Sequence, residues 1–249
     1  MEDQVERLAT KVWDKFHHLS RSQRLLIGVS GIPGSGKTTL AAKVASRLNE
    51  LYHAQLPGAS AGEPPVAGLV PMDGYHLSRA QLDAMPDPHM AHARRGAHFT
   101  FDAESFVRLI KELRKPLAPE TRTLYAPSFD HAVKDPVQDD IAIAPTTRIL
   151  LFEGNYLSLD RDPWRQAARL MDELWFVEVD FETARRRLVG RHVKAGIAKD
   201  EAEANKRVSE NDLVNGKQIV EERVKVDEII VSKEDPRWKP EEQGFEKEE

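Results

Sequence analysis

The feature of the sequence that most constrains its fold is a loop, Gly31 to Thr38, that reads GIPGSGKT. It matches the pattern G-x-x-x-x-G-K-[ST]. It stands between a short apolar run at residues 25–30 and a stretch of helical periodicity at residues 37–55. This order predicts a buried strand, a glycine-rich turn and a helix in direct succession. A chain built on such a unit is expected to form an α/β fold around a parallel sheet.

The chemistry of this loop predicts a phosphate-binding site. Its glycines let several backbone N–H groups point inward, and the following helix adds the positive end of its dipole. We expect the Lys37 ammonium to reach the β- and γ-phosphates of ATP and the Thr38 hydroxyl to bind Mg²⁺. The residues expected to bind the nucleotide are Gly31, Ile32, Pro33, Gly34, Ser35, Gly36, Lys37, Thr38 and Thr39.

Apolar runs and helical periodicity alternate along the rest of the chain. Further strands are expected at 66–72, 148–152, 174–179 and 228–231, and helices at 3–19, 78–85, 102–113, 181–193 and 200–215. Residues 86–100 are predicted to be irregular, and residues 121–147 to form short extended pieces between prolines. The alternation predicts a doubly wound parallel sheet in a three-layer α/β/α fold, with ligands at the carboxyl edge of the strands.

The composition narrows the class of partner. The formal charge of −5 gives no basic footprint for nucleic acid, and the absence of cysteine excludes disulfides and cysteine-ligated zinc. No apolar run approaches the ~20 residues of a membrane span. The first residues are acidic and lack the apolar core of a secretory signal, so the cytoplasm is the expected location.

Two carboxylates follow predicted strands and should meet at the carboxyl edge. Asp73 follows the strand at 66–72, and Glu153 follows the strand at 148–152. An acid at such a position can accept the proton of an acceptor hydroxyl, which predicts a catalytic role for Asp73. Glu153 is predicted to bind Mg²⁺ together with Thr38. The alternatives are an ordinary turn aspartate that caps the next helix and a solvated acid at a strand end.

Basic and aromatic residues supply further candidates. Arg187 and Arg191 lie four residues apart on a predicted helix, so they share a face that can hold a transferring phosphate. The alternative is a solvated basic face, which we expect for the neighbouring arginines. The predicted acceptor pocket consists of Asp73, Tyr75, His76, Arg94, Tyr125 and Tyr156. The four histidines at 76, 89, 92 and 98 lack the helical spacing of a zinc site.

These segments together resemble a known superfamily, that of uridine kinase, pantothenate kinase and phosphoribulokinase. The resemblance rests on the glycine loop, Met72-Asp73-Gly74-Tyr75-His76, Thr100-Phe101-Asp102, Phe152-Glu153-Gly154-Asn155-Tyr156 and the arginine-rich helix, and it covers roughly residues 22–232. It is strongest toward a little-characterised branch of nucleoside- or fructose-kinase-like proteins.

The resemblance implies a P-loop kinase fold with a small helical lid at about residues 183–200. The helical periodicity near the N-terminus predicts that residues 1–21 form a helix packed on this core, and the composition of residues 233–249 predicts an acidic, flexible tail. The resemblance also implies Asp73 as general base, Glu153 in the metal and substrate region, and phosphate contacts from Arg187 and Arg191. Many members of the superfamily form dimers, which makes a homodimer one expectation for this chain.

The expected function is transfer of the ATP γ-phosphoryl group to a hydroxyl of a small metabolite, which is nucleoside-, pantothenate- or sugar-like. Two alternatives stay open. One is a nucleotide-regulated ATPase that acts on a protein partner. The other is a nucleoside monophosphate kinase, in which Arg94 and Arg95 would hold the second phosphate. A GTP-driven switch is not expected, because Asn205-Lys206-Arg207-Val208 lacks the aspartate of a guanine-reading N-K-x-D motif.

Overall fold

The computed structural model describes residues 2–55, 64–130 and 132–233. The predicted acidic tail lies almost entirely outside the described residues. The central sheet has the strand order β2-β5-β1-β6-β7, and each neighbouring pair is parallel. Its strands are β1 (Leu25–Gly31), β2 (Ala67–Pro71), β5 (Ile149–Gly154), β6 (Glu173–Glu178) and β7 (Glu228–Val231). The predicted α/β fold with a parallel sheet is confirmed.

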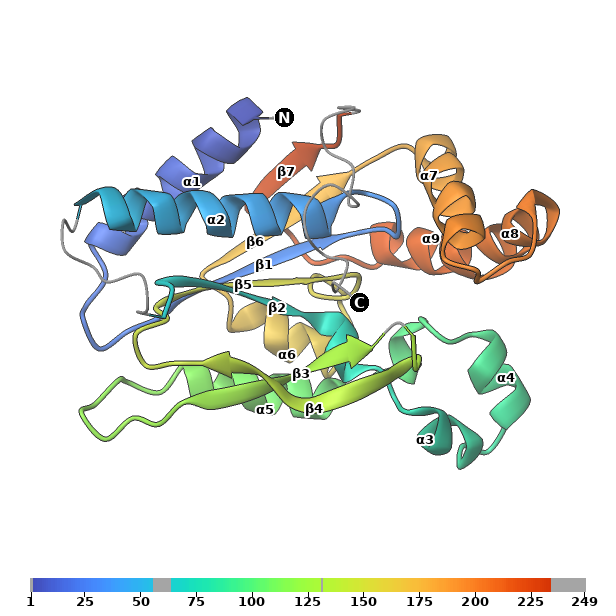
Figure 1. The fold of residues 1–249 in the computed structure, drawn as a ribbon, viewed down its shortest axis with the longest axis horizontal. Coiled ribbons are helices and arrows are strands. Elements are labelled where there is room, and N and C mark those ends of the chain that lie inside the picture. Colours follow the sequence, from blue (N-terminus) through green and yellow to red (C-terminus); the bar gives the residue numbers. More distant parts are fainter. Residues whose placement is uncertain (1, 56–63, 131, 234–249) are drawn as a thin grey trace.

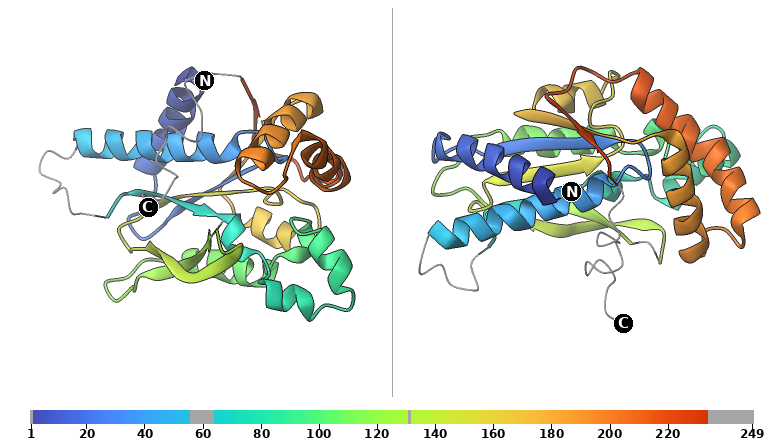
Figure 2. Two further views of the ribbon diagram at one scale, coloured as in Figure 1. Left: turned by 45° about the vertical axis from the view of Figure 1, so that its right-hand side comes forward. Right: turned by 90° about the horizontal axis from the view of Figure 1, so that it is seen from above.

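Helices cover both faces of this sheet (Figure 1). Helices α1 (Glu2–His17) and α2 (Lys37–Gln55) pack on one face, and α5 (Ala103–Leu113) and α6 (Trp164–Arg169) lie on the other. Figure 2 shows the same layers from two further sides.

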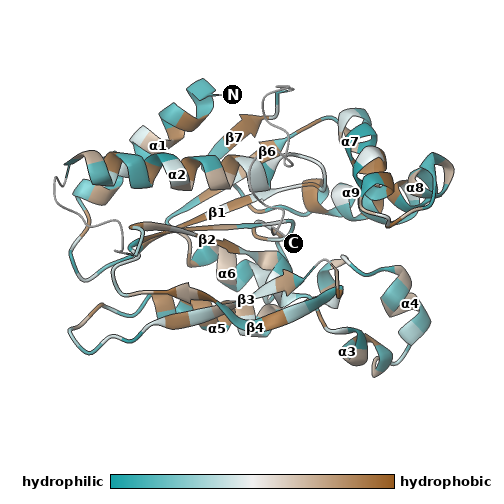
Figure 3. Ribbon diagram, viewed as in Figure 1, coloured by the Kyte–Doolittle hydropathy of each residue, from teal (hydrophilic) through white to brown (hydrophobic). Residues whose placement is uncertain are grey.

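Burial on both faces explains why the strands read as continuous apolar runs. Along β1, Leu26 belongs to the core beneath α5 and α6, whereas Ile27 belongs to the core beneath α1 and α2. Figure 3 shows hydrophobic residues concentrated on these strands. Each fully buried large apolar side chain contributes roughly 1.5–3 kcal/mol to the stability of the fold.

A helical arm follows β6 and projects beyond the carboxyl edge of the sheet (Figure 1). It consists of α7 (Phe181–Lys194), α8 (Glu201–Arg207), a π-helical turn (Val208–Asp212) and α9 (Leu213–Glu221). The arm has a small apolar cluster of its own, made of Leu188, Val189, Ala198, Ala204 and Val208. The helix expected at 200–215 is therefore interrupted by the π-helical turn and continues to residue 221.

Two segments differ from the sequence-based expectation. Residues 86–100, expected to be irregular, contain the helix α4 (Pro88–Ala93), in which Asp87 caps the first turn by accepting from the Met90 N–H. Proline at the first helical position fits a helix start, because its missing N–H would have no partner there. Residues 121–147 contain the antiparallel hairpin of β3 (Leu124–Asp130) and β4 (Asp135–Ile143).

Three more short helical segments complete the described chain, and one of them is the 3₁₀ turn η2 (His98–Thr100). The 3₁₀ turn η1 (Met72–Tyr75) follows β2, and α3 (Arg79–Asp83) follows η1, with Ser78 and Gln81 forming a capping box. The segment of α3 and α4 lies on the same side of the molecule as the arm formed by α7 to α9 (Figure 1). None of the helices in the described part of the chain is long and apolar enough to cross a membrane.

Candidate active site

The glycine loop joins β1 to α2, as its pattern predicts. Gly34 has a φ of +78° and Gly36 a φ of +88°, a region that side-chain-bearing residues rarely adopt. A Cβ atom on Gly34 would also lie 2.9 Å from the Ala184 carbonyl oxygen, so α7 packs directly against the loop. Both positions therefore need glycine for backbone shape, and Gly34 needs it for close packing as well.

The two predicted carboxylates meet this loop at the carboxyl edge of the sheet. Strand β5 pairs with both β1 and β2, so its end at Glu153 lies between them. The Thr38 hydroxyl donates to the Glu153 Oε2 atom at 3.0 Å. Asp73 stands on η1, just after β2, and its side chain is 45% exposed. The three residues that the sequence singled out therefore lie together at the carboxyl edge of the sheet.

The charges of this cluster act strongly on one another. Burial raises the pKa of Glu153 to about 7; the nearby Lys37 ammonium lowers it, and the Asp73 carboxylate raises it further. Burial lowers the pKa of Lys37, against the opposing pull of Glu153 and Asp73. A buried carboxyl that is half-protonated near neutral pH is a site where a bound cation would be stabilising.

The donor set at this point fits Mg²⁺. A carboxylate and a hydroxyl oxygen are hard ligands of the kind that Mg²⁺ takes when phosphates and water supply the remaining positions. Thr38 and Glu153 would hold the ion. Among the described residues there is no group of three or more His, Asp or Glu side chains that would form an all-protein metal cage.

Helix α7 directs its arginines to the same site. Arg187 donates from Nη1 to the Gly34 carbonyl oxygen at 3.1 Å and to the Ser232 hydroxyl at 2.9 Å. Arg191 lies close enough to lower the pKa of both Lys37 and Glu153. Ser232, which follows β7, is absent from the sequence-based predictions. Because Ser232 directly follows the last predicted strand, the sequence pattern could have placed it at the carboxyl edge of the sheet.

The predicted pocket residues have different surroundings. His76 lies beside Asp73, with Nδ1 2.8 Å from the Asp73 backbone oxygen, and its ring centroid is 4.0 Å from that of the tilted Phe101 ring. Tyr125 is 52% exposed on the hairpin. Tyr156 is fully buried, and its hydroxyl donates to the Gly96 carbonyl oxygen at 2.8 Å, which is a structural contact.

Arg94 links the α4 segment to the helical arm. Its Nε atom donates to the Asn211 Oδ1 atom at 3.1 Å, and its Nη2 atom donates to the Asn215 Oδ1 atom at 2.8 Å. Both asparagines are buried, and the Asn211 amide also donates to the Arg95 carbonyl oxygen at 3.0 Å. The sequence-based predictions missed this asparagine pair, although its spacing of four residues on one helical face was visible.

The site has the parts of a P-loop kinase. They are a phosphate loop between a parallel strand and a helix, two acids at the adjoining strand ends, and arginines on a helix that covers the site. The comparisons with known proteins agree. The chain is 57% identical over 159 residues to an ATP-dependent kinase-like protein of Aspergillus versicolor, a match that covers 64% of this chain and 92% of that protein. No protein-family model matches the chain.

Two further comparisons reach the same class. A uridine kinase-like protein of Schizosaccharomyces pombe is 43% identical over 197 residues, which cover 79% of this chain and 78% of that protein. The crystal structure of a fructose transport system kinase-like protein from Silicibacter sp. TM1040 superposes with a TM-score of 0.74 at 31% identity. It covers 90% of this chain and 98% of that one. The chain therefore belongs to the family of uridine kinase-like, ATP-dependent P-loop kinases, and it is a kinase.

Proposed function

We propose that this kinase transfers the γ-phosphoryl group of ATP to a hydroxyl of a small metabolite that is nucleoside-, pantothenate- or sugar-like, with Asp73 as general base. The observation that carries the proposal is the position of Asp73. Its charge acts on both Lys37 and Glu153, yet its own side chain stays 45% exposed and open to a second substrate. A carboxylate in that position can contact an acceptor hydroxyl beside the bound phosphates.

The proposed mechanism assigns one task to each group. The backbone amides of the loop and the Lys37 ammonium hold the β- and γ-phosphates of ATP. Mg²⁺ held by Thr38 and Glu153 would neutralise charge on the phosphates. Asp73 orients the acceptor hydroxyl and takes its proton as the acceptor oxygen bonds to the γ-phosphorus. The bond from that phosphorus to the bridging oxygen then breaks, and ADP leaves.

Helix α7 would close over the reacting groups. Arg187 already contacts the loop through the Gly34 carbonyl oxygen, and Arg191 stands near Lys37. Their guanidinium groups would stabilise the charge that develops on the transferred phosphoryl group. A closed helix also excludes water, which limits wasteful hydrolysis of ATP.

The surroundings of Arg94 and Arg95 favour a hydroxyl acceptor over a nucleoside monophosphate. Arg94 is engaged by Asn211 and Asn215, as described above. Arg95 donates to the Leu77 carbonyl oxygen at 3.0 Å and to Asp135 at 3.2 Å. Both arginines that were candidates for a second phosphate thus have protein partners.

The acceptor can be found by a coupled ADP-release assay on the full chain. Nucleosides, pantothenate, free sugars and sugar acids are added singly to enzyme, ATP and Mg²⁺. We expect one of these classes to raise the rate of ADP release well above the rate without acceptor. Acceleration by a nucleoside monophosphate alone, or by a protein alone, would contradict the proposal and support the corresponding alternative.

A further inference from the structure

Arg187 is held by two contacts that use the same atom of its guanidinium group. Its Nη1 atom donates to the Gly34 carbonyl oxygen at 3.1 Å and to the Ser232 hydroxyl at 2.9 Å. A guanidinium group carries five N–H donors, of which Nη1 has two. Both donors of Nη1 are thus engaged, one by the phosphate loop and one by Ser232. Within the described chain, no residue accepts from the Nε or Nη2 atoms of Arg187.

Ser232 stands on backbone that the sheet holds in place. It directly follows β7, and its N–H donates to the Glu178 carbonyl oxygen, at the end of β6, at 2.7 Å. The preceding residue, Val231, pairs with Glu178 in the parallel ladder. A Cβ atom on Gly36 would lie 3.8 Å from the Ser232 Oγ atom, so the hydroxyl also lies near the phosphate loop. A hydroxyl on such a rigid strand end can fix the orientation of a long and flexible arginine side chain.

The two contacts leave free the edge of the guanidinium group that suits a phosphate. The Nε and Nη2 atoms present two parallel N–H bonds, which is the geometry that binds two oxygen atoms of one phosphate group. The Gly34 carbonyl that accepts from Arg187 belongs to the same loop as the amides that are expected to hold the ATP phosphates. The guanidinium group of Arg187 is therefore close to a phosphate bound by this loop.

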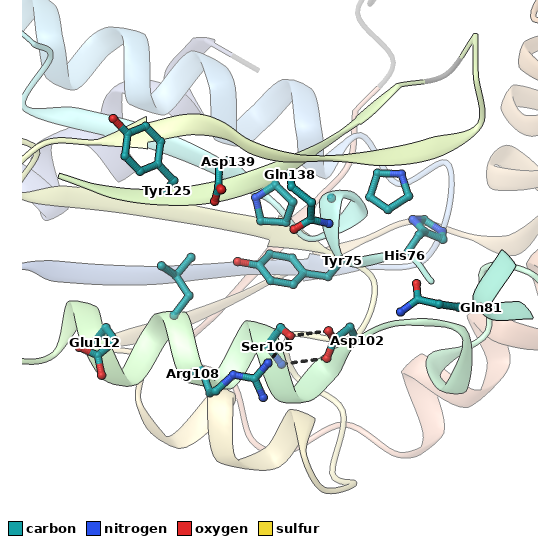
Figure 4. A pocket seen from close by; sticks show the side chains of 14 residues that line it. Tyr75, His76, Gln81, Asp102, Ser105, Arg108, Glu112, Tyr125, Gln138 and Asp139 are labelled. Atoms are coloured by element: carbon teal, nitrogen blue, oxygen red, sulfur yellow. Dashed lines mark hydrogen bonds between the residues drawn. The ribbon is translucent and has the colours of Figure 1, made fainter. Parts of the chain in front are cut away.

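Arg187 lies on the nucleotide side of the site and not in the groove beside Asp73. That groove has a volume of about 290 Å³ and lies between the hairpin β3–β4 and α5, next to the turn that carries Asp73 (Figure 4). Tyr75 and His76 are among its lining residues, whereas Arg187 and Ser232 are not. Since Arg187 contacts the loop and does not line the groove, its position favours an ATP phosphate as its ligand.

We propose that Ser232 is a positioning residue, whose hydroxyl holds Arg187 against the phosphate loop so that the free edge of the guanidinium group binds the γ-phosphate of ATP. The loop amides and Lys37 are expected to surround the β-phosphate, so an arginine on the covering helix meets the terminal phosphate. Without the hydroxyl, Arg187 loses one of its two anchors and must be ordered by the phosphate itself, at a cost in side-chain entropy. The inference rests on the proposed phosphate contact of Arg187, but not on the identity of the acceptor.

The test is isothermal titration calorimetry of the full chain with a non-hydrolysable ATP analogue and with ADP, both in the presence of Mg²⁺. Ser232→Ala should weaken binding of the analogue about tenfold, the effect of one hydrogen bond to a charged group, and binding of ADP by no more than about twofold. Ser232→Thr keeps the hydroxyl and should bind the analogue like the unmodified protein. Ser209→Ala, at an exposed position of the helical arm, is the matched control and should leave both affinities unchanged.

A double-mutant cycle separates an action through Arg187 from a structural role of Ser232. Arg187→Met removes the guanidinium group, so the addition of Ser232→Ala to this variant should change neither affinity further. Neither titration contains an acceptor, so a failure of the proposed acceptor chemistry leaves these results unaffected.

Four results would each overturn the inference. Ser232→Ala could bind the analogue as tightly as the unmodified protein, or it could weaken binding of the analogue and of ADP equally. Ser232→Thr could bind the analogue as weakly as Ser232→Ala does. Lastly, Ser232→Ala could still weaken binding of the analogue when Arg187 is already replaced by methionine.

Discussion

The raised pKa of Glu153 leads to a quantitative prediction about how the affinity for Mg²⁺ depends on pH. Burial raises the pKa of this carboxyl to about 7, and only the ionised form is a good ligand. With that pKa, the ionised fraction rises from about one-eleventh at pH 6 to about ten-elevenths at pH 8. The apparent affinity of the site for Mg²⁺ should therefore increase about tenfold over this range.

The assay is a Mg²⁺ titration, at several pH values, of the binding of a non-hydrolysable ATP analogue. Because nucleotide phosphates also lose a proton in this range, the same titration is made with Glu153→Gln. This variant keeps the shape of the side chain and removes its titration. We expect the tenfold increase that belongs to Glu153 to be absent in the variant. An identical pH dependence in both proteins would refute the reasoning.

The same raised pKa has a consequence for the free protein. The folded state binds the Glu153 proton more tightly than the unfolded state, whose pKa is 4.5. Stability should thus fall as the pH rises from 4.5 to about 7, by on the order of 3 kcal/mol for a shift of this size. Calorimetry should show that Glu153→Gln raises the Tm at pH 8 much more than at pH 4. A lower Tm of the variant at pH 8 would show that the ionised carboxylate is not destabilising.

Two further predictions concern residues outside the phosphate site. Arg94→Met removes two charge-assisted hydrogen bonds between the α4 segment and the helical arm, so kcat/KM for the acceptor should fall about tenfold while the Kd for ATP stays unchanged. Arg169→Met, at an exposed position of α6, is the control. An equal loss of kcat/KM in the control variant would refute a specific link between α4 and the arm. Glu173 is buried and accepts from Lys11 and from the Trp175 indole, which together with Lys15 hold its pKa below 4.5 despite burial. Glu173→Gln should therefore cost about 2 kcal/mol of stability at pH 7 by calorimetry. That difference should disappear as the pH falls through the folded-state pKa, and a constant difference down to pH 3 would contradict the assignment.

The parts of the site that the sequence predicted are those that local chemistry determines. The glycine loop needs a particular backbone shape, and its pattern can be recognised without knowing the rest of the fold. Asp73 and Glu153 follow apolar runs, so their meeting at one edge follows from the rules for parallel sheets. The arginines of α7 share a helical face for the same local reason.

The parts that the sequence did not predict depend on contacts between distant segments. The hairpin pairs residues through Ser128 and Val137 across prolines that normally mark turns, and such pairing is set by packing against η1. The partners of Arg94 lie more than 100 residues away on a helix interrupted by a π-helical turn. No local pattern reports a contact of that kind.

The most direct test of the central claim is steady-state kinetics of Asp73→Asn with the acceptor found in the ADP-release screen. Asparagine keeps the size of the side chain and cannot take the proton of the acceptor hydroxyl. We predict a fall in kcat of about 10²- to 10⁴-fold, with the Kd for ATP nearly unchanged. A variant that turns over at the full rate, or one that loses ATP binding to the same degree as activity, would contradict the role of Asp73 as general base.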